Sequence, residues 1–217
     1  FEASPILHAC ANGSSEFMSN ISTSFVSMLY NMQLLRMLGE DGVSAYGVLM
    51  YVQFIFVAIY IGYAIGCAPI TGYHFGARNH NELKNMLRKS SFLSAVSGVV
   101  LTILAIALSS PLAKLFVGYD EELYELTRHA FRLFAYSFLL AGFNIFTSSF
   151  FTALNNGAVS AAISFMRTLI FQTSSVLILP IFLGVDGIWW AITVAEFFAF
   201  ILSLIFLFAK RKKYNYI

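Results

Sequence analysis

The stretch GIWWAITVAEFFAFILSLIFLFA, residues 187–209, decides the fold class of this chain. A helix of about 20 mostly apolar residues crosses the hydrocarbon core of a membrane, and Glu196 is the single charged side chain in this stretch. The rest of the chain is similar, because 59% of its 217 residues are hydrophobic and 11% are charged. Soluble domains are about 25% charged. The composition therefore excludes a soluble globular domain, a disordered chain and a nucleic-acid-binding protein.

Six apolar stretches of this kind follow one another and predict an all-α, polytopic transmembrane six-helix bundle that forms one domain over residues 1–217. The long runs lack the period-two alternation of a membrane β-barrel. Turn and breaker residues separate the stretches, at 39–42, 69–76, 109–111, 155–157 and 184–187. The predicted spans are 12–38, 43–67, 91–110, 129–153, 160–183 and 187–209.

Nine of the 13 Lys and Arg residues fall on one side of the predicted bundle. Cytoplasmic loops carry an excess of Lys and Arg, so this side is predicted to be cytoplasmic. Both termini then lie in the cytoplasm, as an even number of spans requires. The basic segment 79–90 is expected to form a short interfacial helix that opens the third span. The nine residues are Arg78, Lys84, Arg88, Lys89, Arg167, Lys210, Arg211, Lys212 and Lys213.

A stripe of polar side chains marks the first predicted span. Steps of three or four residues put all of them on one helix face. Lipid cannot satisfy such a stripe, so it must face other helices or a water-filled cavity. The stripe consists of Asn12, Glu16, Asn20, Ser24, Ser27 and Asn31.

Glu16 gives the most specific prediction in this stripe, because a carboxylate in hydrocarbon needs a partner, a proton or a cation. In one interpretation Glu16 binds the coupling ion, a proton or sodium, with Asn20 as a neutral oxygen ligand. In the other, Glu16 lies at the inner headgroup level and pairs with Arg167 or water. The residues alone leave both interpretations open.

Four further polar residues inside predicted spans are candidates for a functional role. Asn144, at mid-depth in the fourth span, is the strongest candidate for substrate contact, and its alternative is an interhelical hydrogen bond. Gln172 has a weaker claim. Arg167 either belongs to the transport pathway or extends its long side chain to the interface. Glu196 lies about ten residues into the last span, where an unpaired acid is costly, so it needs a partner or a proton.

No enzyme signature accompanies these residues. The chain contains no phosphate-binding loop, no H-E-x-x-H and no G-x-S-x-G motif. We therefore expect no enzymatic activity and no cofactor. Because an ATP site is not found either, we expect that any transport is driven by an ion gradient, unless a separate ATPase subunit supplies the energy.

Three strings resemble the multidrug and toxic compound extrusion (MATE) family, and specifically the C-terminal half of a bacterial member. The blocks G-x-x-P-x-x-G-Y-x-x-G-A-R at 66–78 and G-I-W-x-A-x-x-x-A-E at 187–196 carry most of the resemblance. The strings are NGSSEFMSNIS at 12–22, YGVLMYVQFIFVAIYIGYAIGCAPITGYHFGARN at 46–79 and RTLIFQTSSVLILPIFLGVDGIWWAITVAEFFAF at 167–200.

The resemblance implies a twelve-helix antiporter of the inner membrane, built from two six-helix lobes. It implies export of drugs and organic cations in exchange for sodium or protons. This chain corresponds to helices seven to twelve, so its expected partners are membrane lipids, small organic cations and the missing N-terminal lobe or a second copy.

The resemblance also implies roles for single residues. Glu16 resembles the acid that some members carry in the seventh helix, and Asn144 stands where others carry an acid in the tenth. Gly66, Pro69 and Gly72 would relax the second helix at its cytoplasmic end.

Two alternative functions remain. One is a lipid-linked oligosaccharide flippase of the same superfamily, which needs a strongly cationic cavity, although Arg167 is the one basic residue well inside a predicted span. The other is a non-transporting, half-size protein that serves as a scaffold for another lobe.

Overall fold

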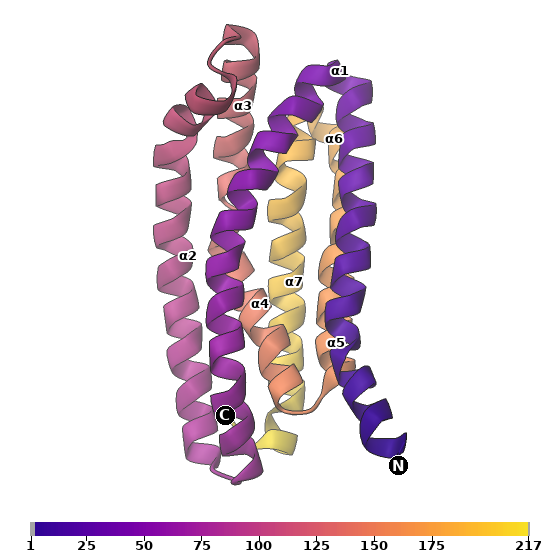
Figure 1. The fold of residues 1–217 in the computed structure, drawn as a ribbon, viewed down its shortest axis with the longest axis vertical. Coiled ribbons are helices and arrows are strands. Elements are labelled where there is room, and N and C mark those ends of the chain that lie inside the picture. The colour runs from indigo at the N-terminus through magenta and orange to yellow at the C-terminus, as the bar shows by residue number, and fades with distance from the viewer. Residues whose placement is uncertain (1–2, 217) are drawn as a thin grey trace.

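The computed structural model describes residues 3–216, except the side chains of 3–9, 11–16, 18 and 19. The described residues form a bundle of helices, as the sequence predicts (Figure 1). The elements are α1 (Ala3–Gly76), α2 (His80–Val117), α3 (Glu121–Ala135), α4 (Phe138–Ala153), α5 (Gly157–Phe165), the π-helix η1 (Met166–Phe171), α6 (Gln172–Leu183) and α7 (Val185–Tyr214).

Helix α1 folds back on itself at Gly39. Its 74 residues would reach about 110 Å if straight, which is more than three times the hydrocarbon thickness. Gly39 has φ 67° and ψ −150°, a left-handed region that favours glycine because it has no Cβ. The chain therefore rises to one end of the bundle and returns (Figure 1), so α1 supplies two passes where the sequence predicts the break at 39–42.

The described residues contain four helical segments long and apolar enough to cross a membrane, in α1, in α2, across α5 to α6, and in α7. Helices α3 and α4 make a fifth if they form one span, because they meet at an angle of 48°. With two passes in α1, each of the six predicted stretches has a place in this arrangement. Both termini, the α1–α2 turn and the α4–α5 connection lie toward the same end (Figure 1).

Two of the predicted breaks are wrong. Helix α1 continues through Pro69 to Gly76, and α2 continues through Pro111. A proline removes one backbone hydrogen bond, but membrane helices tolerate this loss because neighbouring groups satisfy the freed carbonyls.

The buried apolar side chains form two clusters, one toward each end of the bundle. The first, which we call the Trp189 cluster, includes Leu34, Leu49, Phe131, Phe138 and Trp189. The second, the Phe150 cluster, includes Leu83, Phe146, Phe150, Phe151 and Tyr216. Along α4 and α7, buried polar residues separate the two clusters, and these residues make up the site described next.

Candidate functional site

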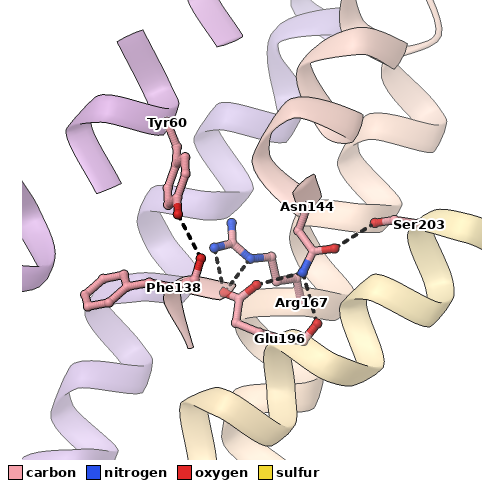
Figure 2. A network of polar contacts seen from close by, with 6 residues as sticks. All are labelled: Tyr60, Phe138, Asn144, Arg167, Glu196 and Ser203. Atoms are coloured by element: carbon pink, nitrogen blue, oxygen red, sulfur yellow. Dashed lines mark hydrogen bonds and ion pairs between the residues drawn. The ribbon is translucent and has the colours of Figure 1, made fainter. Parts of the chain in front are cut away.

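A buried ion pair joins the last helix to the π-helix. Glu196 lies in α7 and is 1% exposed. Its Oε1 accepts hydrogen bonds from Nε of Arg167 at 2.9 Å and from Nη2 at 2.6 Å (Figure 2). Arg167 is thus the partner that Glu196 was expected to need. The Arg167 side chain does not extend to the interface as a solitary charge, although 18% of its surface stays exposed.

Asn144 completes the contacts of this carboxylate from the opposite side. Its Nδ2 donates to Oε2 of Glu196 at 2.7 Å and to the backbone carbonyl of the same residue at 3.0 Å. Its Oδ1 accepts from the Ser203 hydroxyl at 3.2 Å (Figure 2). Asn144 and Ser203 are fully buried. Four polar residues therefore form one connected network that links α4, η1 and α7, and we call it the Glu196 network.

The π-helix η1 positions Arg167. It interrupts the predicted span 160–183 between α5 and α6, and Arg167 is its second residue. A π-turn holds one more residue than an α-turn, so it rotates the side chains that follow, and such segments often occur at functional sites. No sequence signal for η1 was recognised, because its residues Met166–Phe171 fit an ordinary apolar helix.

The charges of the Glu196 network balance within an apolar part of the bundle. The network lies between the two apolar clusters, where an isolated charge costs several kcal/mol. One guanidinium and one carboxylate cancel, and Asn144 and Ser203 satisfy the remaining directions. The network can hold α4, η1 and α7 in one register. Neutralising either charge, or separating the two, would break the contacts that hold these elements together.

Tyr60 makes a buried contact that the sequence did not predict. Its hydroxyl donates to the backbone carbonyl of Phe138 at 2.8 Å, at the bend between α3 and α4 (Figure 2). The ring is buried, at 4% exposure. The contact connects residues 78 positions apart, so no local pattern could have predicted it.

The fourth predicted span also carries a polar stripe, which on α4 divides between two neighbouring helices. Asn144 turns toward α7, whereas the Ser148 hydroxyl lies 2.9 Å from that of Ser160 and 3.0 Å from that of Ser164 on α5. Thr152 donates to the Ser160 hydroxyl at 2.7 Å. These are the interhelical hydrogen bonds that the sequence left open as the alternative to a binding role.

The stripe on the first half of α1 lies apart from the Glu196 network. Asn20, Ser24 and Asn31 are exposed, and the Ser24 hydroxyl donates to the carbonyl of Asn20 at 3.3 Å. Ser27 is half-buried and borders a small cavity together with Tyr46. The side chains of Asn12 and Glu16 lie outside the described residues, so the coupling-ion prediction for Glu16 stays a prediction.

Asn31 and Gln172 line two different hollows. Asn31 borders a groove of about 450 Å³ between the two arms of α1, with Met28, Met32, Leu35, Glu40, Val43 and Ser44. Gln172 is half-buried and borders a small cavity of about 40 Å³ that includes Ser27, Tyr30 and Tyr46. The structure therefore brings Asn144, Arg167 and Glu196 together and leaves Asn20, Ser24, Asn31 and Gln172 outside that cluster.

The three positions expected to relax the second predicted span lie within continuous helix. Gly66, Pro69 and Gly72 belong to the second pass of α1, and a Cβ on Gly72 would meet the Ala153 carbonyl at 3.7 Å. The described residues hold no group of three or more His, Cys, Asp or Glu side chains that could bind a metal ion. The sodium site at Glu16 and Asn20 stays a prediction, because the Glu16 side chain is not among the described ones.

One family model matches this chain, and several solved structures share its fold. The MatE family model matches residues 17–176. A search of the curated proteins gives no match. Several solved structures share the fold of this chain, and each is about twice as long, since the chain spans 48% or 49% of them.

Three of these structures have a TM-score of 0.89. A multidrug resistance MATE family transporter of the MOP superfamily, in an outward-facing conformation, is 20% identical and covers 98% of this chain. A Vibrio cholerae MATE transporter is 17% identical and covers 100%. A MOP superfamily transporter from Pyrococcus furiosus, described as having a binding pocket of reversed polarity, is 21% identical and covers 97%.

Proposed function

The chain belongs to the MATE family, and from this premise we propose that it forms one lobe of a cation-coupled secondary antiporter. In this proposal the complete protein exports drugs or organic cations across the inner membrane in exchange for sodium or protons. The multi-pass helical bundle and its match to half of each solved transporter support the proposal.

The exposed polar face of α1 carries the proposal. Asn20, Ser24 and Asn31 lie along one side of a helix that is otherwise apolar enough to cross a membrane. Lipid does not satisfy polar groups along such a length, so this face needs a water-filled cavity or another group of helices. A central cavity between two lobes meets that need, and it would place the face next to a passing substrate.

Glu16 is the proposed coupling residue on this face. A carboxylate there would bind sodium together with Asn20, or would carry a proton between the two sides of the membrane. Asn31 and Gln172 would contact the organic cation. The second pass of α1, at Gly66, Pro69 and Gly72, would bend to open the lobe at its cytoplasmic end.

The Glu196 network has a different role in the proposal. Arg167 already balances Glu196, so this carboxylate is not a vacant cation site. The network would keep α4, η1 and α7 in register while the lobe moves as one body. The same pairing disfavours a flippase, because the guanidinium of Arg167 is engaged by a carboxylate and does not offer a surplus positive charge to a pyrophosphate group.

Ion-driven efflux in the native protein that contains this chain tests the proposal. Glu16→Gln removes the charge and keeps the size of the side chain. We expect it to abolish dye efflux driven by a sodium or pH gradient in membrane vesicles, with unchanged protein levels. The matched control is Glu121→Gln, an exposed acid in the first turn of α3, which should leave efflux unchanged.

Unchanged coupling and unchanged drug resistance in Glu16→Gln would overturn the role of this residue. A complete lack of ion-driven efflux in the wild-type protein would instead favour a non-transporting scaffold. An upstream reading frame that encodes six more spans is expected for the antiporter and is not required by the scaffold.

A further inference from the structure

One end of the bundle collects basic side chains that no described acid neutralises. The start of α2 exposes Lys84, Arg88 and Lys89, and the end of α7 exposes Arg211 and Lys212. Among the described residues, the ion pairs all lie elsewhere. The acid within 76–90, Glu82, accepts a hydrogen bond from the Asn85 side chain.

Aromatic packing holds the two basic segments at the same end. The chain after α7 turns back so that Tyr216 is fully buried, and its hydroxyl donates to the carbonyl of Leu207 at 3.1 Å. The ring of Tyr214 contacts that of Phe75, at the end of α1, with 5.7 Å between centroids. Leu83 of α2 belongs to the same Phe150 cluster. The basic tail and the start of α2 therefore meet the same cluster at the same end of the bundle (Figure 1).

The basic side chains of α2 continue directly into an apolar face. At helical spacing, Lys84 and Arg88 are followed by Phe92, Val99 and Ile103, which are 71%, 48% and 62% exposed. An exposed apolar face on a membrane helix lies against acyl chains. Charged groups at the end of such a face sit where the headgroups of the same lipids lie, with their aliphatic stems along the hydrocarbon boundary.

We propose that this basic end binds the headgroup of an anionic phospholipid, with Lys84 and Arg88 as its main contacts and the tail residues Arg211 and Lys212 as a second arm. The acyl chains of this lipid lie along the Phe92 face of α2. Guanidinium and ammonium groups donate to phosphate oxygens, and a cluster of Lys and Arg near a membrane surface attracts anionic lipid. A soluble phosphate compound could use the same donors, but it would gain nothing from the adjacent apolar face.

Lipid titration of the native protein in a neutral detergent tests this site. Native mass spectrometry would follow binding of phosphatidylglycerol, with phosphatidylcholine and inorganic phosphate as separate arms. We expect phosphatidylglycerol to bind, phosphatidylcholine to bind much more weakly and inorganic phosphate not to compete. The double variant K84Q/R88Q should weaken phosphatidylglycerol binding by about 25-fold, at about fivefold for each charge removed near the surface.

Two control variants separate charge from folding. K84R/R88K keeps both charges and should bind like the wild type. Lys114→Gln removes an exposed charge at the other end of α2 and should also have no effect. Equal binding of the two phospholipids, competition by inorganic phosphate, or unchanged phosphatidylglycerol binding in K84Q/R88Q would each overturn the proposal.

Discussion

Removing the charge of Arg167 should destabilise the lobe more than removing the charge of Glu196. In Arg167→Met, Glu196 keeps the hydrogen bond from Asn144 but loses both bonds to its Oε1. The carboxylate is 1% exposed. Leaving a buried charge unpaired costs about 3–5 kcal/mol, and we expect a loss of this size in the free energy of unfolding.

Glu196→Gln leaves the other charge alone, but in a different situation. The amide oxygen of glutamine still accepts from Asn144, and the Arg167 side chain is 18% exposed, so its guanidinium can turn toward water. The loss is then mainly that of charged hydrogen bonds, about 1.5–3 kcal/mol. The double variant R167M/E196Q contains neither charge, and replacing a buried ion pair by neutral groups is often close to neutral.

Equilibrium unfolding of the native protein in detergent micelles, followed by circular dichroism, measures all three variants. We expect the double variant to be more stable than Arg167→Met, which is the sign of direct coupling between the two sites. A double variant whose loss equals the sum of the single losses would refute the coupling. Equal losses in the two single variants would refute the argument from burial.

Two further contacts offer tests of the packing around the network, with the same unfolding measurement. In Gly98→Ala the new Cβ would lie 2.5 Å from the carbonyl oxygen of Leu139, and because the backbone cannot move away easily we expect the free energy of unfolding to fall by about 1–3 kcal/mol. The control Gly62→Ala meets nothing within 4 Å and should gain up to about 1 kcal/mol of stability from helix propensity. A gain in both variants would contradict the close approach of α2 and α4. Tyr60→Phe removes the hydrogen bond to Phe138 and should lower the free energy of unfolding by about 0.5–1.5 kcal/mol. The control Tyr51→Phe changes a ring that is 68% exposed and should have no measurable effect. Equal effects of the two variants would mean that the Tyr60 hydroxyl does not hold the bend.

Local sequence patterns predicted the elements that depend on local physics. Apolar length marked the helices, and Gly39 marked the fold-back because a glycine is needed at its positive φ. The helix breaks predicted at Pro69 and Pro111 were wrong, because neighbouring helices support a helix that the proline alone would interrupt. The bend between α3 and α4 and the π-helix η1 were not predicted, because both depend on packing against other helices.

The site shows the same limit at the level of single residues. The sequence indicated that Glu196 needs a partner, since the cost of an unpaired acid depends only on its place in an apolar run. It did not identify Arg167 as that partner, because the two residues are 29 positions apart and lie on different elements. The role of Asn144 was also open until its amide was seen to bond Glu196 and Ser203.

The amino-acid sequence by itself determined that this chain is a multi-pass helical membrane protein, and it carried the resemblance to the MATE family. Those conclusions follow from composition and short motifs, which act along the chain. The tertiary structure decided which polar groups meet: the Glu196 network, the hydroxyl contacts between α4 and α5, and the anchored basic end. Such contacts join distant residues, and their energies arise from burial and geometry that only the folded bundle creates.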